Sequence, residues 1–127
     1  MTPTEQRVLS LIPQDEVTSV LQDFVRIPTI VSNEQAGAEY FAARLREWGI
    51  PDAMIQGIEG YPGRSNLVAR LPGRSAPKGP TLLVTSHMDA IAIDDTADRD
   101  QWTVDPLGGE IRDVRVYGRG ASANKSG

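Results

Sequence analysis

One segment reads Thr81-Leu82-Leu83-Val84-Thr85-Ser86-His87-Met88-Asp89 and carries the most information about the fold. Its first five residues form an apolar run of strand length, which Gly79-Pro80 bounds. Such a run is typical of a central strand that is covered on both faces, as in parallel sheets. Open α/β sheets bind ligands at the ends of these strands, so His87 and Asp89 lie where a functional site is expected.

Two amphipathic helices are predicted before this strand. The first ends at Pro28, and its apolar residues recur at helical spacing: Val17, Val20, Leu21, Phe24 and Val25. The second is predicted to begin at Ser32, because Ser32 and Gln35 have the spacing of a capping box. Gly49 is a natural end for this helix, since glycine adopts the left-handed conformation common at helix C-termini.

Further strands are predicted on both sides of the central one. Residues 65–71 alternate between apolar and polar types and are closed by Pro72-Gly73. Residues 109–111 and 114–117 have the pattern of a hairpin around Arg112-Asp113. Helices followed by several strands predict an α/β fold, in which the remaining helices that cover the sheet are not in this chain.

Composition limits the possible functions. The 127 residues are enough for one domain, and the net charge of −4 with a pI near 4.9 argues against binding nucleic acid or anionic membranes. Without cysteine there is no disulfide scaffold, cysteine zinc site or thiol nucleophile. The N-terminal residues lack the pattern of a signal peptide, and no long apolar run is present, so we expect a cytoplasmic protein.

His87 is the single histidine, and two interpretations of it remain open. It could be a hydrogen-bonded histidine of the fold, with Asp89 capping a loop. Alternatively, a neutral imidazole binds a metal through one nitrogen while the carboxylate orients it through the other. A zinc site with two or three imidazoles cannot be completed by this chain, so any metal site must be rich in carboxylates or shared with another polypeptide.

Two other patterns are weaker. An acidic stretch contains Asp94, Asp95, Asp98 and Asp100 but lacks the glycine and glutamate of an EF-hand loop, so a solvated loop is predicted rather than a calcium site. Residues 118–123 formally fit a dinucleotide-binding fingerprint. That fingerprint requires a βαβ unit and a later acidic residue, so no nucleotide site is predicted.

Several short motifs, taken together, resemble one family. They follow a helical stretch that ends Val25-Arg26-Ile27-Pro28-Thr29, and in order they are Ser86-His87-Met88-Asp89, Trp102, Asp105-Pro106-Leu107, Tyr117-Gly118-Arg119-Gly120-Ala121-Ser122 and Lys125-Ser126-Gly127. The family is that of the co-catalytic zinc metallopeptidases and deacylases. It includes aminoacylases, acetylornithine deacetylases, succinyl-diaminopimelate desuccinylases, glutamate carboxypeptidases and carnosinase-like dipeptidases.

The resemblance implies a fold and a metal site. Residues 1–127 would be the N-terminal portion of the catalytic domain, with part of a mixed, mostly parallel sheet flanked by helices. The lid domain and the C-terminal half, with the catalytic glutamate, would be absent. His87 would be a zinc ligand and Asp89 the catalytic-site carboxylate that orients it. The aspartate that bridges the two zinc ions of the family would fall at position 123, where this chain has Ala123.

Two hypotheses about function follow. In the first, the chain is part of a zinc-dependent hydrolase that cleaves the amide bond of N-acyl amino acids or short peptides, and is inactive alone because alanine cannot coordinate a cation. In the second, it is a non-catalytic, truncated or split pseudoenzyme module that binds a partner chain. An incomplete sheet exposes an unpaired edge, so self-association or a complementing chain is expected.

Overall fold

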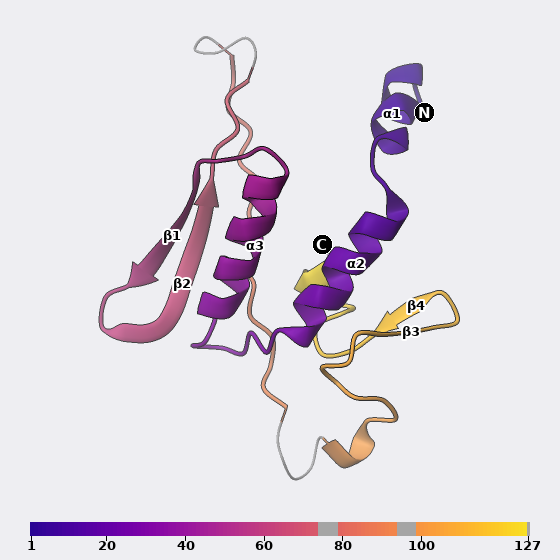
Figure 1. Ribbon diagram of the computed structural model, residues 1–127, viewed down its shortest axis with the longest axis vertical. Helices are drawn as coiled ribbons and strands as arrows, with labels where there is room; N and C mark the ends of the chain where they lie inside the picture. Colours follow the sequence, from indigo (N-terminus) through magenta and orange to yellow (C-terminus); the bar gives the residue numbers. More distant parts are fainter. Residues whose placement is uncertain (74–78, 94–98, 127) are drawn as a thin grey trace. The chain divides into compact units, whose positions relative to one another are not determined.

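The computed structural model describes residues 1–73, 79–93 and 99–126 (Figure 1). The chain forms two compact units, a first unit of residues 1–26 and 93–126 and a second unit of residues 27–92. Its elements are, in order, α1 (Pro3–Ser10), α2 (Gln14–Arg26), α3 (Gln35–Glu47), β1 (Ala53–Ile58), β2 (Tyr61–Ala69), the 3-10 helix η1 (Arg99–Gln101), β3 (Glu110–Arg112), β4 (Arg115–Tyr117) and the 3-10 helix η2 (Asn124–Ser126). None of the helices in the described part of the chain could span a membrane.

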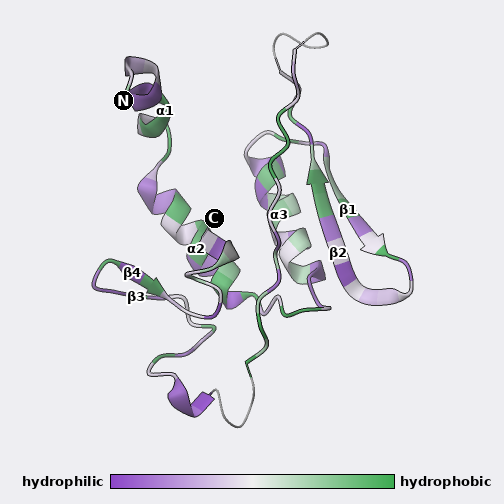
Figure 2. Cartoon of the chain, turned by 180° about the vertical axis from the view of Figure 1, so that it is seen from behind, coloured by the Kyte–Doolittle hydropathy of each residue, from purple (hydrophilic) through white to green (hydrophobic). Residues whose placement is uncertain are grey.

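The first unit is organised around helix α2, which confirms the predicted amphipathic helix. Figure 2 shows hydrophobic and hydrophilic residues along this helix. Phe24 and Val25 are its buried residues, and the helix contacts β4 and η2. Burying these two side chains supplies the hydrophobic contribution that attaches the C-terminal segments to the helix.

The predicted hairpin is also confirmed in the first unit, although its turn lies one residue later than the Arg112-Asp113 turn that was expected. Strands β3 and β4 are antiparallel and pair Glu110 with Tyr117. The two residues between the strands, Asp113 and Val114, have φ angles of 50° and 60°. Two successive residues with positive φ are characteristic of a type I′ turn, whose twist matches that of the flanking strands.

The second unit is a helix on a hairpin. Strands β1 and β2 are antiparallel, with Ala53 opposite Ala69, and α3 packs against both strands. Ala38 and Ala42 of α3 are fully or almost fully buried. Short alanine side chains at buried positions allow a helix to pack closely against its neighbours.

The start of α3 differs from the prediction. The helix begins at Gln35, and Ser32 lies before it with a φ of 75°, so Ser32 is not its capping residue. The main-chain N–H of Ser32 donates instead to Glu34 Oε1 at 3.0 Å. The predicted capping box is wrong because a residue in the left-handed region does not have the extended backbone that an N-cap requires.

The strands differ more strongly from expectation. β2 overlaps the strand predicted at residues 65–71, whereas β1 was not predicted. The strand predicted at residues 81–85 is wrong, since these residues have no regular secondary structure and Leu82 is 86% exposed. An apolar run becomes a central strand only when strands lie on both sides of it. The described residues therefore form a small α/β structure with two antiparallel sheets, in place of the mostly parallel sheet expected.

Candidate functional site

The structure brings His87 and Asp89 together. Nδ1 of His87 lies 3.0 Å from Oδ1 of Asp89 and 3.2 Å from the Asp89 main-chain oxygen. A carboxylate can only accept a hydrogen bond, so this contact places a proton on Nδ1, and in the neutral ring the lone pair is then on Nε2. This contact fits both a histidine that is only hydrogen-bonded within the fold and a histidine that binds a metal. A metal ligand would need the neutral tautomer with its proton on Nδ1, so that Nε2 can bind the ion.

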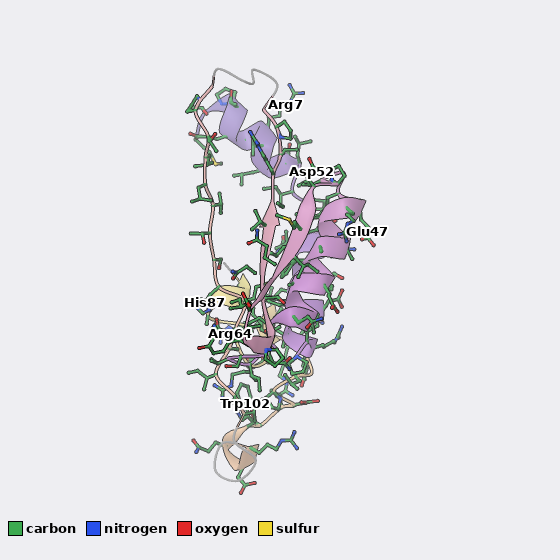
Figure 3. The ribbon with its side chains drawn as sticks, turned by 90° about the vertical axis from the view of Figure 1, so that its left-hand side faces the viewer. Arg7, Glu47, Asp52, Arg64, His87 and Trp102 are labelled. Atoms are coloured by element: carbon green, nitrogen blue, oxygen red, sulfur yellow. The ribbon has the colours of Figure 1, made fainter. Side chains whose placement is uncertain are left out.

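The segment that carries this pair is extended, and Figure 3 labels His87 on it. The His87 side chain is 63% exposed and that of Asp89 32%. Neither residue is therefore enclosed within the second unit, and the imidazole is open to solvent. An exposed imidazole held by a carboxylate can bind a ligand without losing its orientation.

Thr29 fixes the position of this segment. Its hydroxyl donates to the Met88 carbonyl at 2.8 Å, and its own carbonyl accepts from the Ala90 N–H at 2.7 Å. An isolated parallel bridge pairs Ile30 with Ala90. Thr29 is only 1% exposed, so these bonds form away from competing water. The segment that follows Pro28 thus holds the residues on either side of Asp89.

The segment after β4 belongs to the first unit and is closely packed. A Cβ atom on Gly118 would lie 2.3 Å from Val25 Cγ1 and 3.0 Å from the Pro106 carbonyl oxygen. Gly120 has a φ of 86°, which favours glycine. The Arg119 N–H between them donates to the same Pro106 oxygen at 2.7 Å. The two glycines are required here by close approach and by backbone conformation.

Ala123 lies in the turn that follows these glycines. Its N–H donates to the Gly120 carbonyl at 3.1 Å, and its carbonyl accepts from the Ser126 hydroxyl at 2.9 Å. The methyl group of Ala123 is exposed. The three predicted site positions are therefore divided between the units, with Ala123 in the first and His87 and Asp89 in the second.

Trp102 and Asp105 make local contacts within the first unit. Asp105 Oδ1 accepts the Leu107 N–H at 2.9 Å, which closes the turn before β3. The Arg119 guanidinium carbon lies 5.1 Å from the centre of the Trp102 ring, within the range of a cation–π interaction.

Lys125 is a buried cation that the sequence did not single out as a site residue. It is 8% exposed, and its Nζ donates to the Phe24 carbonyl at 2.8 Å. Burial lowers the pKa of Lys125 from 10.5 to about 8, because removing an ammonium from water disfavours its charged form. Thr29 was missed as well. In both cases the partner is far away in the sequence, where no local pattern could indicate it.

The described residues fit part of a zinc site. The pair of His87 and Asp89 suits one ligand and its orienting carboxylate. In the described part of the chain, no group of three or more His, Cys, Asp or Glu side chains could hold a metal ion, and Ala123 offers no side-chain donor. Most of the acidic stretch considered for calcium, including Asp94, Asp95 and Asp98, lies outside the described residues.

No family model matches the chain. The curated proteins that it resembles, described next, are succinyl-diaminopimelate desuccinylases. The chain is 34% identical over 110 residues to a succinyl-diaminopimelate desuccinylase of Rhodospirillum centenum, covering 86% of this chain and 27% of that protein. It is 38% identical over 105 residues to succinyl-diaminopimelate desuccinylase 2 of Ruegeria sp., covering 83% of this chain and 24% of that protein.

A probable succinyl-diaminopimelate desuccinylase of Staphylococcus epidermidis is 29% identical over 119 residues, which are 94% of this chain and 27% of that protein. The chain thus spans about a quarter of the length of the curated relatives that it matches. Over most of its own length, this chain is a homologue of the succinyl-diaminopimelate desuccinylases, which are members of the zinc peptidase and deacylase family.

Proposed function

We propose that this chain provides part of a zinc-dependent hydrolase that removes the acyl group from an N-acyl amino acid, with a succinylated diamino acid as the first substrate to test. Homology to desuccinylases over most of the chain carries the proposal. Water would cleave the amide bond and release a carboxylic acid and an amine. Bound zinc would supply Lewis-acid polarisation of the carbonyl and an activated water.

The roles of this chain's own residues follow from the contacts. Asp89 holds the proton on Nδ1 of His87 and fixes the plane of the ring. Thr29 holds the main chain around the pair through Met88 and Ala90. Together these contacts would present Nε2 in one orientation, so that little side-chain entropy is lost when a ligand binds.

We propose further that the 127 residues are inactive by themselves. One imidazole with one orienting carboxylate does not make a tetrahedral zinc site. Position 123 carries a methyl group where the family resemblance implies a bridging aspartate. Calorimetric titration of the chain with zinc tests this, and tight stoichiometric binding would contradict it.

A chimera provides the test of activity. Residues 1–127 replace the matching part of the Rhodospirillum centenum desuccinylase, with either alanine or aspartate at position 123, and amine release from a succinylated amino acid is measured with zinc. The chimera with Ala123→Asp should be active and the parent chimera inactive. Adding His87→Ala should abolish activity, whereas Asp89→Asn should lower it about 10–100-fold, the usual cost of losing an orienting partner.

A carboxylate outside the site serves as the matched control. Asp100 is exposed in η1, and Asp100→Asn should leave the chimera as active as its parent. Activity that survives His87→Ala would refute the assignment of His87. Activity that is equal with alanine and aspartate at position 123 would refute the role proposed for that position.

A second candidate function is a non-catalytic module that binds a partner or a second copy. It is favoured by Leu82, Leu83 and Val84, three successive apolar side chains that are more than 80% exposed. Such a segment can pair with an added strand. Sedimentation of the chain over a range of concentrations tests for self-association, and a monomer at every concentration would count against it. Docking without hydrolysis by either chimera would favour this module over the enzyme.

A further inference from the structure

Lys125 is a buried charged group to which the proposed reaction gives no role. Its alkyl chain passes beside Gly120, where an added Cβ would lie 3.0–3.2 Å from the Lys125 Cδ, Cγ and Cε atoms. Its ammonium group lies 4.6 Å from the centre of the Phe24 ring and donates to the Phe24 carbonyl. The side chain thus joins the segment after β4 to the last turn of α2.

The Phe24 carbonyl lies in the last turn of α2, where a donor from outside the helix can bind it. In a continuing helix it would accept the N–H of the residue four positions later. That residue is Pro28, which has no N–H, and α2 ends at Arg26. Cations are favoured at helix C-termini, where the carbonyl groups concentrate negative charge. Lys125 supplies both a hydrogen bond to this carbonyl and the favourable charge.

Residue 123 is hydrogen-bonded on both sides to residues that lie next to Lys125. Its N–H is bonded to the Gly120 carbonyl, and its carbonyl to the Ser126 hydroxyl. Gly120 lies against the Lys125 alkyl chain, and Ser126 adjoins Lys125 in η2. Residue 123 is therefore held at both ends by groups that Lys125 fixes to α2.

We infer that Lys125 is a positioning residue, which holds residues 118–126 on the end of helix α2 through its ammonium group and thereby sets the orientation of position 123. The inference rests on the proposed function in one respect, namely that position 123 matters for the chemistry. The attachment itself can be measured without any activity. A charge-assisted hydrogen bond and a cation–π contact both require the ammonium, so a neutral side chain of similar length should not replace Lys125.

The absence of cysteine allows a direct test in the full 127-residue chain. Lys125→Cys is alkylated either with 2-bromoethylamine, which restores an ammonium at nearly the original length, or with iodoacetamide, which adds a neutral amide. Hydrogen exchange of the Ala121 and Ala123 amides is then followed by NMR at about pH 6.5, where the lysine is mostly protonated. Amides of α2 serve as the internal reference for folding of the first unit.

We expect the aminoethyl form to retain the protection of the unmodified chain. The carboxamidomethyl form should lose protection about 10–100-fold at Ala121 and Ala123, as expected for loss of a hydrogen bond to a charged group, with α2 unchanged. Equal protection in the two alkylated forms would overturn the inference. It would also be overturned if the aminoethyl form failed to restore protection while α2 stayed protected.

A measurement on the unmodified chain guards against a variant that does not fold. The ε-methylene protons of Lys125 should be shifted upfield by the Phe24 ring, and a scalar coupling should connect its Nζ with the Phe24 carbonyl carbon. Random-coil shifts for these protons, with no such coupling, would overturn the inference without any substitution.

Discussion

Replacing Gly118 by alanine tests how closely the segment after β4 packs on α2. The new Cβ would lie 2.3 Å from Val25 Cγ1 and 3.0 Å from the Pro106 oxygen, whereas carbon contacts are favourable at about 3.5–4.0 Å. Neither Val25 nor Pro106 can move away without a cost in free energy. Val25 has no exposed surface, and the Pro106 oxygen is bonded to the Arg119 N–H at 2.7 Å.

The cost follows from these contacts. Overpacking a well-packed site costs about 1–3 kcal/mol, and a side chain at the Gly118 φ of 154° adds about 1 kcal/mol. We expect Gly118→Ala to lower the free energy of unfolding of the first unit by about 2–4 kcal/mol. Urea denaturation measures this, and in a Trp48→Phe background the fluorescence reports on Trp102, which belongs to that unit.

Gly57→Ala is the matched control. Gly57 lies in β1, and an added Cβ would meet nothing within 4 Å. In a Trp102→Phe background, where Trp48 reports on the second unit, this substitution should change stability by no more than about 1 kcal/mol. The reasoning is refuted if Gly118→Ala unfolds at the urea concentration of its parent, or if Gly57→Ala is equally destabilising.

Two further outcomes follow from single residues. Val114 is a β-branched residue with a φ of 60° and 94% exposure, so Val114→Gly should relieve strain without loss of packing. It should stabilise the first unit by about 1 kcal/mol, and an unchanged melting temperature would count against it. Thr29→Val removes the donor to the Met88 carbonyl and should destabilise the second unit by about 1–3 kcal/mol. In NMR spectra of that variant, a persistent Nδ1–H tautomer of His87 would show that Thr29 does not support the pair.

Some of this architecture could be predicted because its signals are local. Apolar residues recur at helical spacing from Val17 to Val25, and Pro28 cannot continue a helix, so the sequence predicts α2. The β3–β4 hairpin joins neighbouring residues and could be predicted, with its turn expected at Arg112-Asp113, one residue before the observed Asp113-Val114 turn. His87 and Asp89 are two positions apart, and their contact needs no distant partner. Helix α1 was not predicted, although the sequence contains a signal for it. Thr2 and Glu5 have the spacing of a capping box, and they form one in the structure.

Other features depend on tertiary context. The apolar character of residues 81–85 predicts a strand only if neighbouring strands are present, and the described second unit pairs β1 with β2 alone. The backbone of Ser32 enters the left-handed region, which its side chain does not indicate. The attachment of Lys125 to Phe24 arises only after the chain has folded, since a single lysine in a sequence has no pattern that reveals burial.

The bond from Thr29 to Met88 has a consequence for the order of folding. It joins residues 59 positions apart, while the contacts within α2 or between β1 and β2 join near neighbours in the sequence. Closing so long a loop costs entropy that is recovered only when its ends have ordered surroundings. The segment that carries His87 is therefore expected to join the second unit after its hairpin has formed. By the same reasoning, it is the part of that unit that opens first when stability is lowered.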